Sequence, residues 1–189
     1  MNIPTYTLKR ALESVIQAAA DDGYRPMLTV IHWNCAGDQA ILTAADGYML
    51  TQRRVVASET DNPPMAGLLP KSAMQAVVTL CETTSAIQIT VVDGAWRFET
   101  MDTCIVAKPL AWSPPDYRKV FDKFHTETAL TITVDRNLLL AALDQAGPRI
   151  TLRLSATDQP LLLSSPDHRS MVMPMSGTAT GFDYLEPRQ

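Results

Sequence analysis

The three histidines are the first side chains to consider as acids, bases or metal ligands. His32 lies in a strand-like pattern, His125 in a linker and His168 in a turn, and none is paired at a metal-ligand spacing. Ser165 and Asp167 stand near His168, but a catalytic triad is defined by three-dimensional roles and not by adjacency, which favours a polar turn. The sequence also lacks a nucleophile elbow and a glycine-rich phosphate loop. It therefore predicts a protein that is not an enzyme, with no catalytic residue, metal or cofactor.

The cysteines offer no alternative chemistry. Cys35, Cys81 and Cys104 are odd in number, far apart and form no CxxC pair. This spacing indicates neither a disulfide framework nor a zinc site. We expect three buried, reduced thiols, because free cysteines are among the most buried residues.

Composition and charge narrow the class of protein. The 189 residues, with 46% hydrophobic and 19% charged side chains, suit one large or two small globular domains. No apolar run reaches the roughly 18–20 residues of a membrane helix, and the first ten residues lack signal-peptide features. We therefore expect a cytoplasmic protein with no membrane partner. The net charge of −4 argues against binding of nucleic acid over the whole surface, but allows a small basic lining.

The elements that would position functional groups form one pattern three times, a short amphipathic helix followed by strands. Apolar periodicity predicts helices over Thr7–Ala20 and Pro70–Cys81, and a third from the N-cap Asp135 to the stop at Gly147-Pro148. The helix starts recur about every 64 residues, which is longer than the usual solenoid period. Each helix would cover the apolar face of its own sheet, an α+β arrangement.

The strands and loops follow from alternation and from turn residues. Asp93-Gly94 predicts a tight hairpin between two alternating runs, and Ile150, Leu152 and Leu154 form one apolar face in the third unit. Ser58–Pro64 is expected to be a loop and Trp112–Thr128 a linker, because both contain paired prolines.

Four short segments, in order, resemble the bacterial DNA polymerase III beta subunit, the DNA sliding clamp. Ala44–Leu50 (AADGYML) resembles that family's ATDGHRL, and Pro114–Val120 (PPDYRKV) resembles its FPDYRRV linker. Met171–Met175 (MVMPM) resembles the VVMPM near the end of those chains, and Arg25–Leu28 falls where clamps carry a similar segment. The sequence departs from the family pattern at Ala45, Met49 and Ser176.

The resemblance implies the DNA-clamp (processivity-fold) architecture. Residues 1–120 would correspond to the middle clamp domain, with two helix-plus-strands units, and residues 121–176 to the second half of the last domain. Residues 177–189 would form a flexible tail. A clamp subunit has six such halves, so four chains with three units each would match the twelve halves of a ring, which implies a homo-oligomer.

The resemblance also implies a hydrophobic pocket for short peptides of partner proteins. Flexible methionine side chains suit varied apolar anchors. An alternative left open is that the methionine-rich run is a core strand and that Asp46-Gly47 is only a turn. The implied pocket residues are Leu28, Gly47, Tyr48, Met49, Leu50, Pro115, Lys119, Val120, Met171, Val172, Met173, Pro174 and Met175.

As a clamp relative, the chain would serve as a replication or repair processivity factor that binds duplex DNA non-specifically and docks polymerases or repair proteins. Basic residues on clamp helices contact phosphates without reading base sequence. The alternative function is a peptide-binding module that competes for, or adapts, clamp-binding proteins without encircling DNA. The candidates for facing DNA are Lys9, Arg10, Arg25, Lys71 and Arg136.

Overall fold

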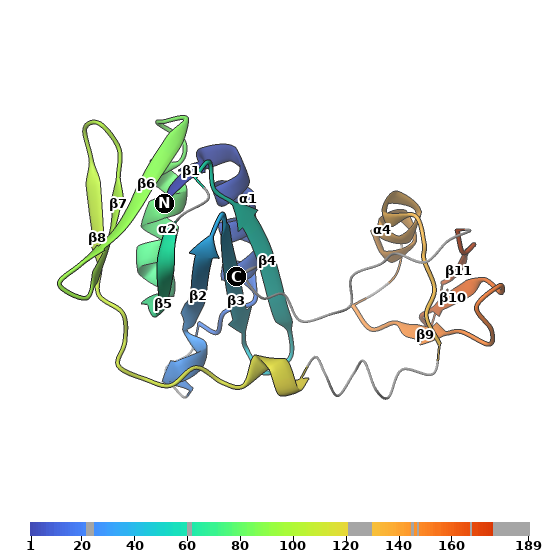
Figure 1. Cartoon of the computed structure of the whole chain (residues 1–189). Coiled ribbons are helices and arrows are strands. Elements are labelled where there is room, and N and C mark those ends of the chain that lie inside the picture. The colour runs from blue at the N-terminus through green and yellow to red at the C-terminus, as the bar shows by residue number, and fades with distance from the viewer. Residues whose placement is uncertain are drawn as a thin grey trace. The chain divides into compact units, whose positions relative to one another are not determined.

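The computed structural model describes residues 1–21, 25–59, 62–120, 130–144, 146, 148–166 and 168–175. The expectations for His125, Asp167, Gly147, the end of the linker and the tail 177–189 lie outside these residues. The chain divides into two compact units, the first Met1–Tyr117 and the second beginning at Arg118, and each is described by itself (Figure 1).

The first sheet of unit 1 has four antiparallel strands in the order β4-β3-β2-β5. They are β2 (Val30–Gly37), β3 (Gln39–Ala45), β4 (Leu50–Val56) and β5 (Asn62–Pro70). Asp46 and Gly47 form the turn between β3 and β4, so the Asp-Gly turn expected there is confirmed. The two edge strands, β4 and β5, lie on opposite sides of the sheet.

The second sheet has the order β1-β6-β7-β8 and is also antiparallel. Its strands are β1 (Asn2–Pro4), β6 (Ala86–Val92), β7 (Ala95–Glu99) and β8 (Cys104–Ala107). The predicted hairpin is confirmed, because Asp93 and Gly94 join β6 to β7 with φ of 51° and 75°. Positive φ at both central residues matches the right-handed twist of the flanking strands.

The two sheets exchange a strand, which the sequence did not predict. Each helix of unit 1 is preceded by a strand that pairs with the sheet of the other half: β1 with β6, and β5 with β2. The predicted end of the loop Ser58–Pro64 was wrong, because β5 begins at Asn62. Pro63 and Pro64 are tolerated there because β5 is an edge strand and its register with β2 shifts between Cys35 and Gly37.

The first two helices were predicted to within about three residues at each end. Helix α1 (Thr5–Gln17) buries Leu8, Leu12 and Val15, and α2 (Lys71–Leu80) buries Met74, Val77 and Leu80. Each begins directly after a proline, Pro4 or Pro70, in extended conformation. Helix α1 packs on β3 and β4, α2 packs on β5 and β8, and the two helices contact each other. None of the helices in the described residues is long and apolar enough to cross a membrane.

A single hydrophobic core joins the two halves of unit 1. Trp33 of β2 lies 5.6 Å from both Trp96 and Phe98 of β7, measured between ring centroids. All three rings are buried. Large aromatic rings bury much apolar area and gain further energy in tilted and edge-to-face contacts. The first two predicted units are therefore one folded body with one core.

The second unit is smaller. Helix α4 (Arg136–Asp144) starts as predicted, because Asp135 Oδ1 accepts hydrogen bonds from the backbone N–H groups of Asn137 and Leu138. Strands β9 (Thr151–Arg153), β10 (Leu161–Ser164) and β11 (Arg169–Val172) form a sheet in the order β11-β10-β9. The small core contains Ala142, Leu163 and Val172 with their neighbours. The inward place expected for Leu152 was wrong: its side chain is 54% exposed.

Candidate functional site

The turn between β3 and β4 is held by its own aspartate. Asp46 Oδ1 accepts hydrogen bonds of 2.7 Å from the backbone N–H groups of Tyr48 and Met49. These bonds, and to a smaller extent the charge of Arg25, lower the pKa of the Asp46 carboxyl. Tyr48 is 92% exposed and Met49 44% exposed. The turn therefore presents two large apolar side chains to solvent from a fixed backbone.

The backbone conformation favours glycine at position 47, and a side chain there would also displace Arg25. The φ of Gly47, 93°, lies in the region that favours glycine, and a Cβ atom there would collide with the guanidinium of Arg25. Arg25, which was expected to face DNA, therefore lies against the turn. Through this contact the turn adjoins the segment that precedes β2.

That segment forms one wall of an apolar groove in unit 1. The short 3-10 helix η1 (Pro26–Leu28) is closed by its own bond from Thr29 N to Pro26 O. A second bond, from Ala20 N to Leu28 O, ties it to the segment after α1. The groove has a volume of about 620 Å³. Its lining residues are Arg25, Pro26, Met27, Leu28, Trp112 and Pro115.

The groove overlaps only part of the predicted pocket. Leu28 and Pro115 line it, and Gly47 touches its residue Arg25. Leu50, at the start of β4, is half-buried and pairs with Ala45. Sequence reasoning missed Met27 and Trp112, which are 47% and 43% exposed. The Arg25–Leu28 segment had matched the family pattern, but only Leu28 was carried over as a pocket residue.

The remaining predicted pocket residues belong to the second unit. Lys119 and Val120 are exposed, in a helical turn that begins at the buried Tyr117. Pro174 forms an isolated antiparallel β-bridge with Val134, and Met175 N donates a hydrogen bond of 2.7 Å to Thr133 O.

Met171 of β11 and the two methionines that follow this strand, Met173 and Met175, face solvent. Met171, Met173 and Met175 are 72%, 60% and 53% exposed, whereas Val172 between them is buried. This alternation is typical of a strand with one free face. The core-strand alternative is therefore wrong for the three methionines and right for Val172. That this face borders the groove of unit 1 stays a prediction.

Both lysines expected to face DNA, Lys9 and Lys71, are paired with carboxylates. Lys9 Nζ lies 2.8 Å from a carboxylate oxygen of Glu82, and that hydrogen bond raises the pKa of Lys9. Lys71 Nζ lies 2.6 Å from Asp21 and also donates to Ala19 O. In both cases the lysine ties the end of one element to another.

The arginines behave differently. Arg10 borders a second hollow, with Arg53 and Arg54 of β4, neither of which sequence reasoning had singled out. Arg136 is exposed at the start of α4, in the second unit.

The groups first considered for chemistry have structural roles. His32 is half-buried, and its ring stacks on Tyr117 at 6.0 Å between centroids; burial lowers the pKa of His32. Ser165 N donates to His168 O, as in the predicted turn. Within the described ranges, no group of three or more histidine, cysteine or acidic side chains could hold a metal ion.

The cysteine prediction was right for two of the three thiols. Cys35 and Cys81 are buried and free, and burial raises their pKa to about 12 and about 11. Cys104 is exposed on β8, because that strand is the outer edge of its sheet.

Comparison with solved structures identifies the fold. The chain is similar to the DNA polymerase III beta subunit of Thermotoga maritima, with 19% identity, a TM-score of 0.75, and coverage of 94% of this chain and 51% of that one. It is similar to the DNA polymerase sliding clamp of Bacillus subtilis, with 16% identity, a TM-score of 0.73, and coverage of 92% of this chain and 48% of that one. It is also similar to the beta subunit of Streptococcus pyogenes DNA polymerase, with 14% identity, a TM-score of 0.69, and coverage of 93% of this chain and 50% of that one. These identities show the fold alone, and they confirm the predicted α+β clamp architecture. The chain spans about half the length of these relatives.

Sequence comparison identifies the family. A search of curated proteins found no significant match. The profile of the family described as "DNA polymerase III beta subunit, central domain" matches residues 2–116, which is more than half of the 189 residues. The match covers almost all of unit 1, including the turn and the groove. The chain therefore belongs to the DNA polymerase III beta subunit family.

Proposed function

We propose that the chain is a sliding-clamp-like processivity factor for DNA replication or repair, which binds DNA non-specifically and docks short peptides of polymerases. The observation that carries the proposal is the apolar groove of unit 1, formed by residues that the family resemblance had marked, Leu28 and Pro115, and by neighbours from the same segments. The similar proteins from Bacillus subtilis and Thermotoga maritima are a DNA polymerase sliding clamp and a DNA polymerase III beta subunit.

The chemistry of the groove suits an apolar peptide anchor. About 620 Å³ is within the range of small-ligand sites and would accept a few aliphatic or aromatic side chains. Met27 adapts its shape and Trp112 supplies a large rigid face, and such residues dominate binding energy at interfaces. Arg25 adds a positive charge at the rim, which favours a peptide with an acidic residue beside its apolar anchors.

The methionine face of the second unit is, in this proposal, a further contact surface for the apolar side chains of partner proteins. Met171, Met173 and Met175 are exposed and apolar, and a contiguous exposed apolar face is typical of an interaction site. Exposed edge strands such as β4 and β8 favour self-association, as expected for a clamp that closes as a homo-oligomer.

A second candidate function is a peptide-binding module that does not encircle DNA. It is favoured by one observation: all the described residues that line the groove belong to unit 1. Light scattering at several concentrations separates the two candidates, because a clamp should form a closed oligomer and a module a monomer or dimer. Retention on circular DNA that is lost when the DNA is linearised supports encirclement.

Peptide docking is tested by fluorescence anisotropy with a labelled clamp-binding peptide. Met27→Ala and Met173→Ala should each weaken binding about tenfold, which corresponds to about 1.4 kcal/mol and is typical of truncating an apolar anchor. The matched controls are Met101→Ala in unit 1 and Leu138→Ala in unit 2. Their side chains are also exposed, but they neither line the groove nor belong to the segment Met171–Met175.

The outcomes separate the parts of the proposal. Loss of affinity in Met27→Ala alone would restrict docking to unit 1 and favour the module. Equal losses in the variants and their controls would contradict a specific site. Failure of the unmodified protein to bind the peptide would remove the docking proposal.

A further inference from the structure

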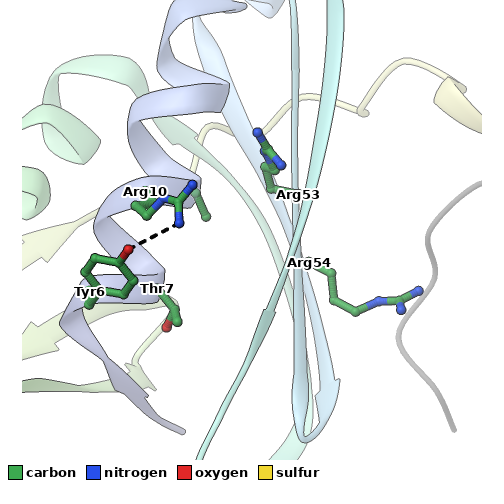
Figure 2. A pocket seen from close by; sticks show the side chains of 6 residues that line it. Tyr6, Thr7, Arg10, Arg53 and Arg54 are labelled. Atoms are coloured by element: carbon green, nitrogen blue, oxygen red, sulfur yellow. Dashed lines mark hydrogen bonds between the residues drawn. The ribbon is translucent and has the colours of Figure 1, made fainter. Parts of the chain in front are cut away.

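A second hollow in unit 1 is lined by arginines from two elements. It has a volume of about 260 Å³ and lies between the start of α1 and the edge strand β4. Arg10 comes from α1, and Arg53 and Arg54 come from β4 (Figure 2). The other described lining residues are Tyr6, Thr7 and Ala11, so no carboxylate of the described residues lines the hollow.

The arginines of this hollow are not paired with carboxylates of the described residues. Within the described part of the chain, none of the three guanidinium groups forms an ion pair with a carboxylate. Lys9, one residue from Arg10, is by contrast bound to Glu82. Like charges close together repel one another, and an anion bound between the arginines would relieve that repulsion.

The geometry leaves hydrogen-bond donors directed into the hollow. Arg10 Nη1 donates to Tyr6 Oη at 3.2 Å, and because that oxygen is the acceptor, the Tyr6 hydroxyl hydrogen stays available to a ligand. Arg53 is oriented by a 3.0 Å bond from its Nε to Ser14 Oγ, which leaves its terminal nitrogens for an anion. Figure 2 shows Arg54 leaving β4 in a different direction from Arg53, as expected for neighbours on a strand. Arg54 therefore adds positive field at the rim.

The N-terminus of α1 also adds positive potential to the hollow. Tyr6 and Thr7 lie in the first turn of α1, which has no acidic residue and no capping side chain. The positive end of the helix dipole is therefore not neutralised locally. Arginine forks, a hydroxyl donor and a helix start are the groups that bind phosphate oxygens.

We propose that this hollow is a phosphate-binding site, in which Arg10 and Arg53 hold one oxyanion and Arg54 guides it, and that it takes a backbone phosphate of duplex DNA. The identity of the ligand as DNA rests on the proposed function, whereas the site itself rests on the arginine cluster. Free phosphate would satisfy the same donors, so the two sources are distinguished by experiment. Contacts to a backbone phosphate carry no base sequence information, as a protein that slides requires.

The DNA arm measures binding of the full chain to a labelled duplex over a range of salt. The slope of log Kobs against log salt is negative, and Arg10→Gln and Arg53→Gln should each reduce its magnitude by about 1. If each contact contributes nothing at 1 M salt, losing one phosphate contact lowers the affinity of the variant about eightfold below that of the unmodified protein in 0.1 M salt. Lys108→Gln, an exposed lysine of unit 1 outside the hollow, is the control for the same loss of charge.

The phosphate arm follows the arginine Nε–Hε signals by nuclear magnetic resonance while inorganic phosphate is added. Selective loss of DNA binding in Arg10→Gln and Arg53→Gln supports the site and its DNA ligand. A shift of the Arg10 and Arg53 signals with phosphate, in a protein that binds no DNA, supports the site but overturns DNA binding as its role. DNA binding that falls no further in these variants than in Lys108→Gln overturns the site and leaves the proposed function intact.

Thermal unfolding checks for a purely structural role. Because the three charges repel one another, Arg54→Gln should leave the melting temperature unchanged or raise it in low salt. A clear fall in melting temperature for all three variants, with no change in DNA binding or in the response to phosphate, would overturn the proposal.

Discussion

The contact between Gly47 and Arg25 can be tested by a pair of glycine substitutions. Gly47 and Gly94 both have positive φ, 93° and 75°, so alanine at either position costs about 1–2 kcal/mol of backbone strain. A Cβ at Gly94 meets nothing within 4 Å, whereas a Cβ at Gly47 collides with Arg25. The pair therefore separates backbone strain from displacement of Arg25.

The expected magnitudes follow from this difference. Both variants should lose about 2–4 °C in melting temperature for each kcal/mol, as for a chain of this size. Only Gly47→Ala should also lower the affinity for the labelled peptide, about tenfold or 1.4 kcal/mol, because Arg25 lines the groove and must move. Calorimetry and fluorescence anisotropy measure the two effects on the same samples.

A double variant completes the test. If Gly47→Ala acts by displacing Arg25, it should have little further effect on peptide affinity in an Arg25→Ala background, because the group that it displaces is gone. Equal loss of peptide affinity in Gly94→Ala, or a full additional loss in the double variant, would refute the assignment of Gly47 and Arg25 to one wall of the groove.

Three further predictions concern the core, the buried histidine and the thiols. Phe98→Ala should lower the free energy of unfolding by about 3–5 kcal/mol in urea denaturation, because a fully buried ring leaves a cavity; a loss below 1 kcal/mol would contradict the shared aromatic core. Burial lowers the pKa of His32 below its usual 6.5, so the unfolded chain binds that proton more tightly and stability should fall as the pH drops below about 6.5. Urea unfolding at several pH values should show that His32→Gln loses this component, and an unchanged pH profile would argue against it. Ellman's reagent should modify only Cys104 quickly in the folded protein and nothing quickly in Cys104→Ser, since Cys35 and Cys81 are buried with pKa values of about 12 and 11; rapid reaction of all three thiols would contradict the fold.

Local signals in the sequence were sufficient for most individual elements. The periodicity that predicted the first two helices depends on one buried face, and that face is formed by Leu8, Leu12 and Val15 in α1. The Asp93-Gly94 hairpin was readable because its two residues alone determine the positive φ values of the turn. Predictions of this kind need only residues that are neighbours along the chain.

Pairing between distant segments was not readable. Ile3 pairs with Ile87, and three residues of strand carry no alternation from which to predict it. Pro63 and Pro64 were strong loop signals, but an edge position and a register shift accommodate them in β5. Tertiary context decided both cases.

The candidate site divides in the same way. Family-like segments identified Leu28 and Pro115, but Trp112 carried no local signal, because only the folded chain brings it to η1. The arginine hollow was missed for a related reason: Arg10 and Arg53 stand on different elements, and ordinary charge patterning considers one helix or strand at a time. Leu152 had the right alternation, but β9 is an edge strand and leaves it exposed.

The reciprocal strand exchange in unit 1 limits how this body can be divided. Its two helix starts are matched: Thr5 N donates to Ser85 O just before β6, and Lys71 N donates to Thr29 O just before β2. Each half thus lends the other its outermost strand. Cleavage of the backbone near Ser58 would leave two fragments that each carry a missing piece of the other, so they should reassociate rather than fold separately. A lone half could complete its sheet only by borrowing that strand from a sister molecule.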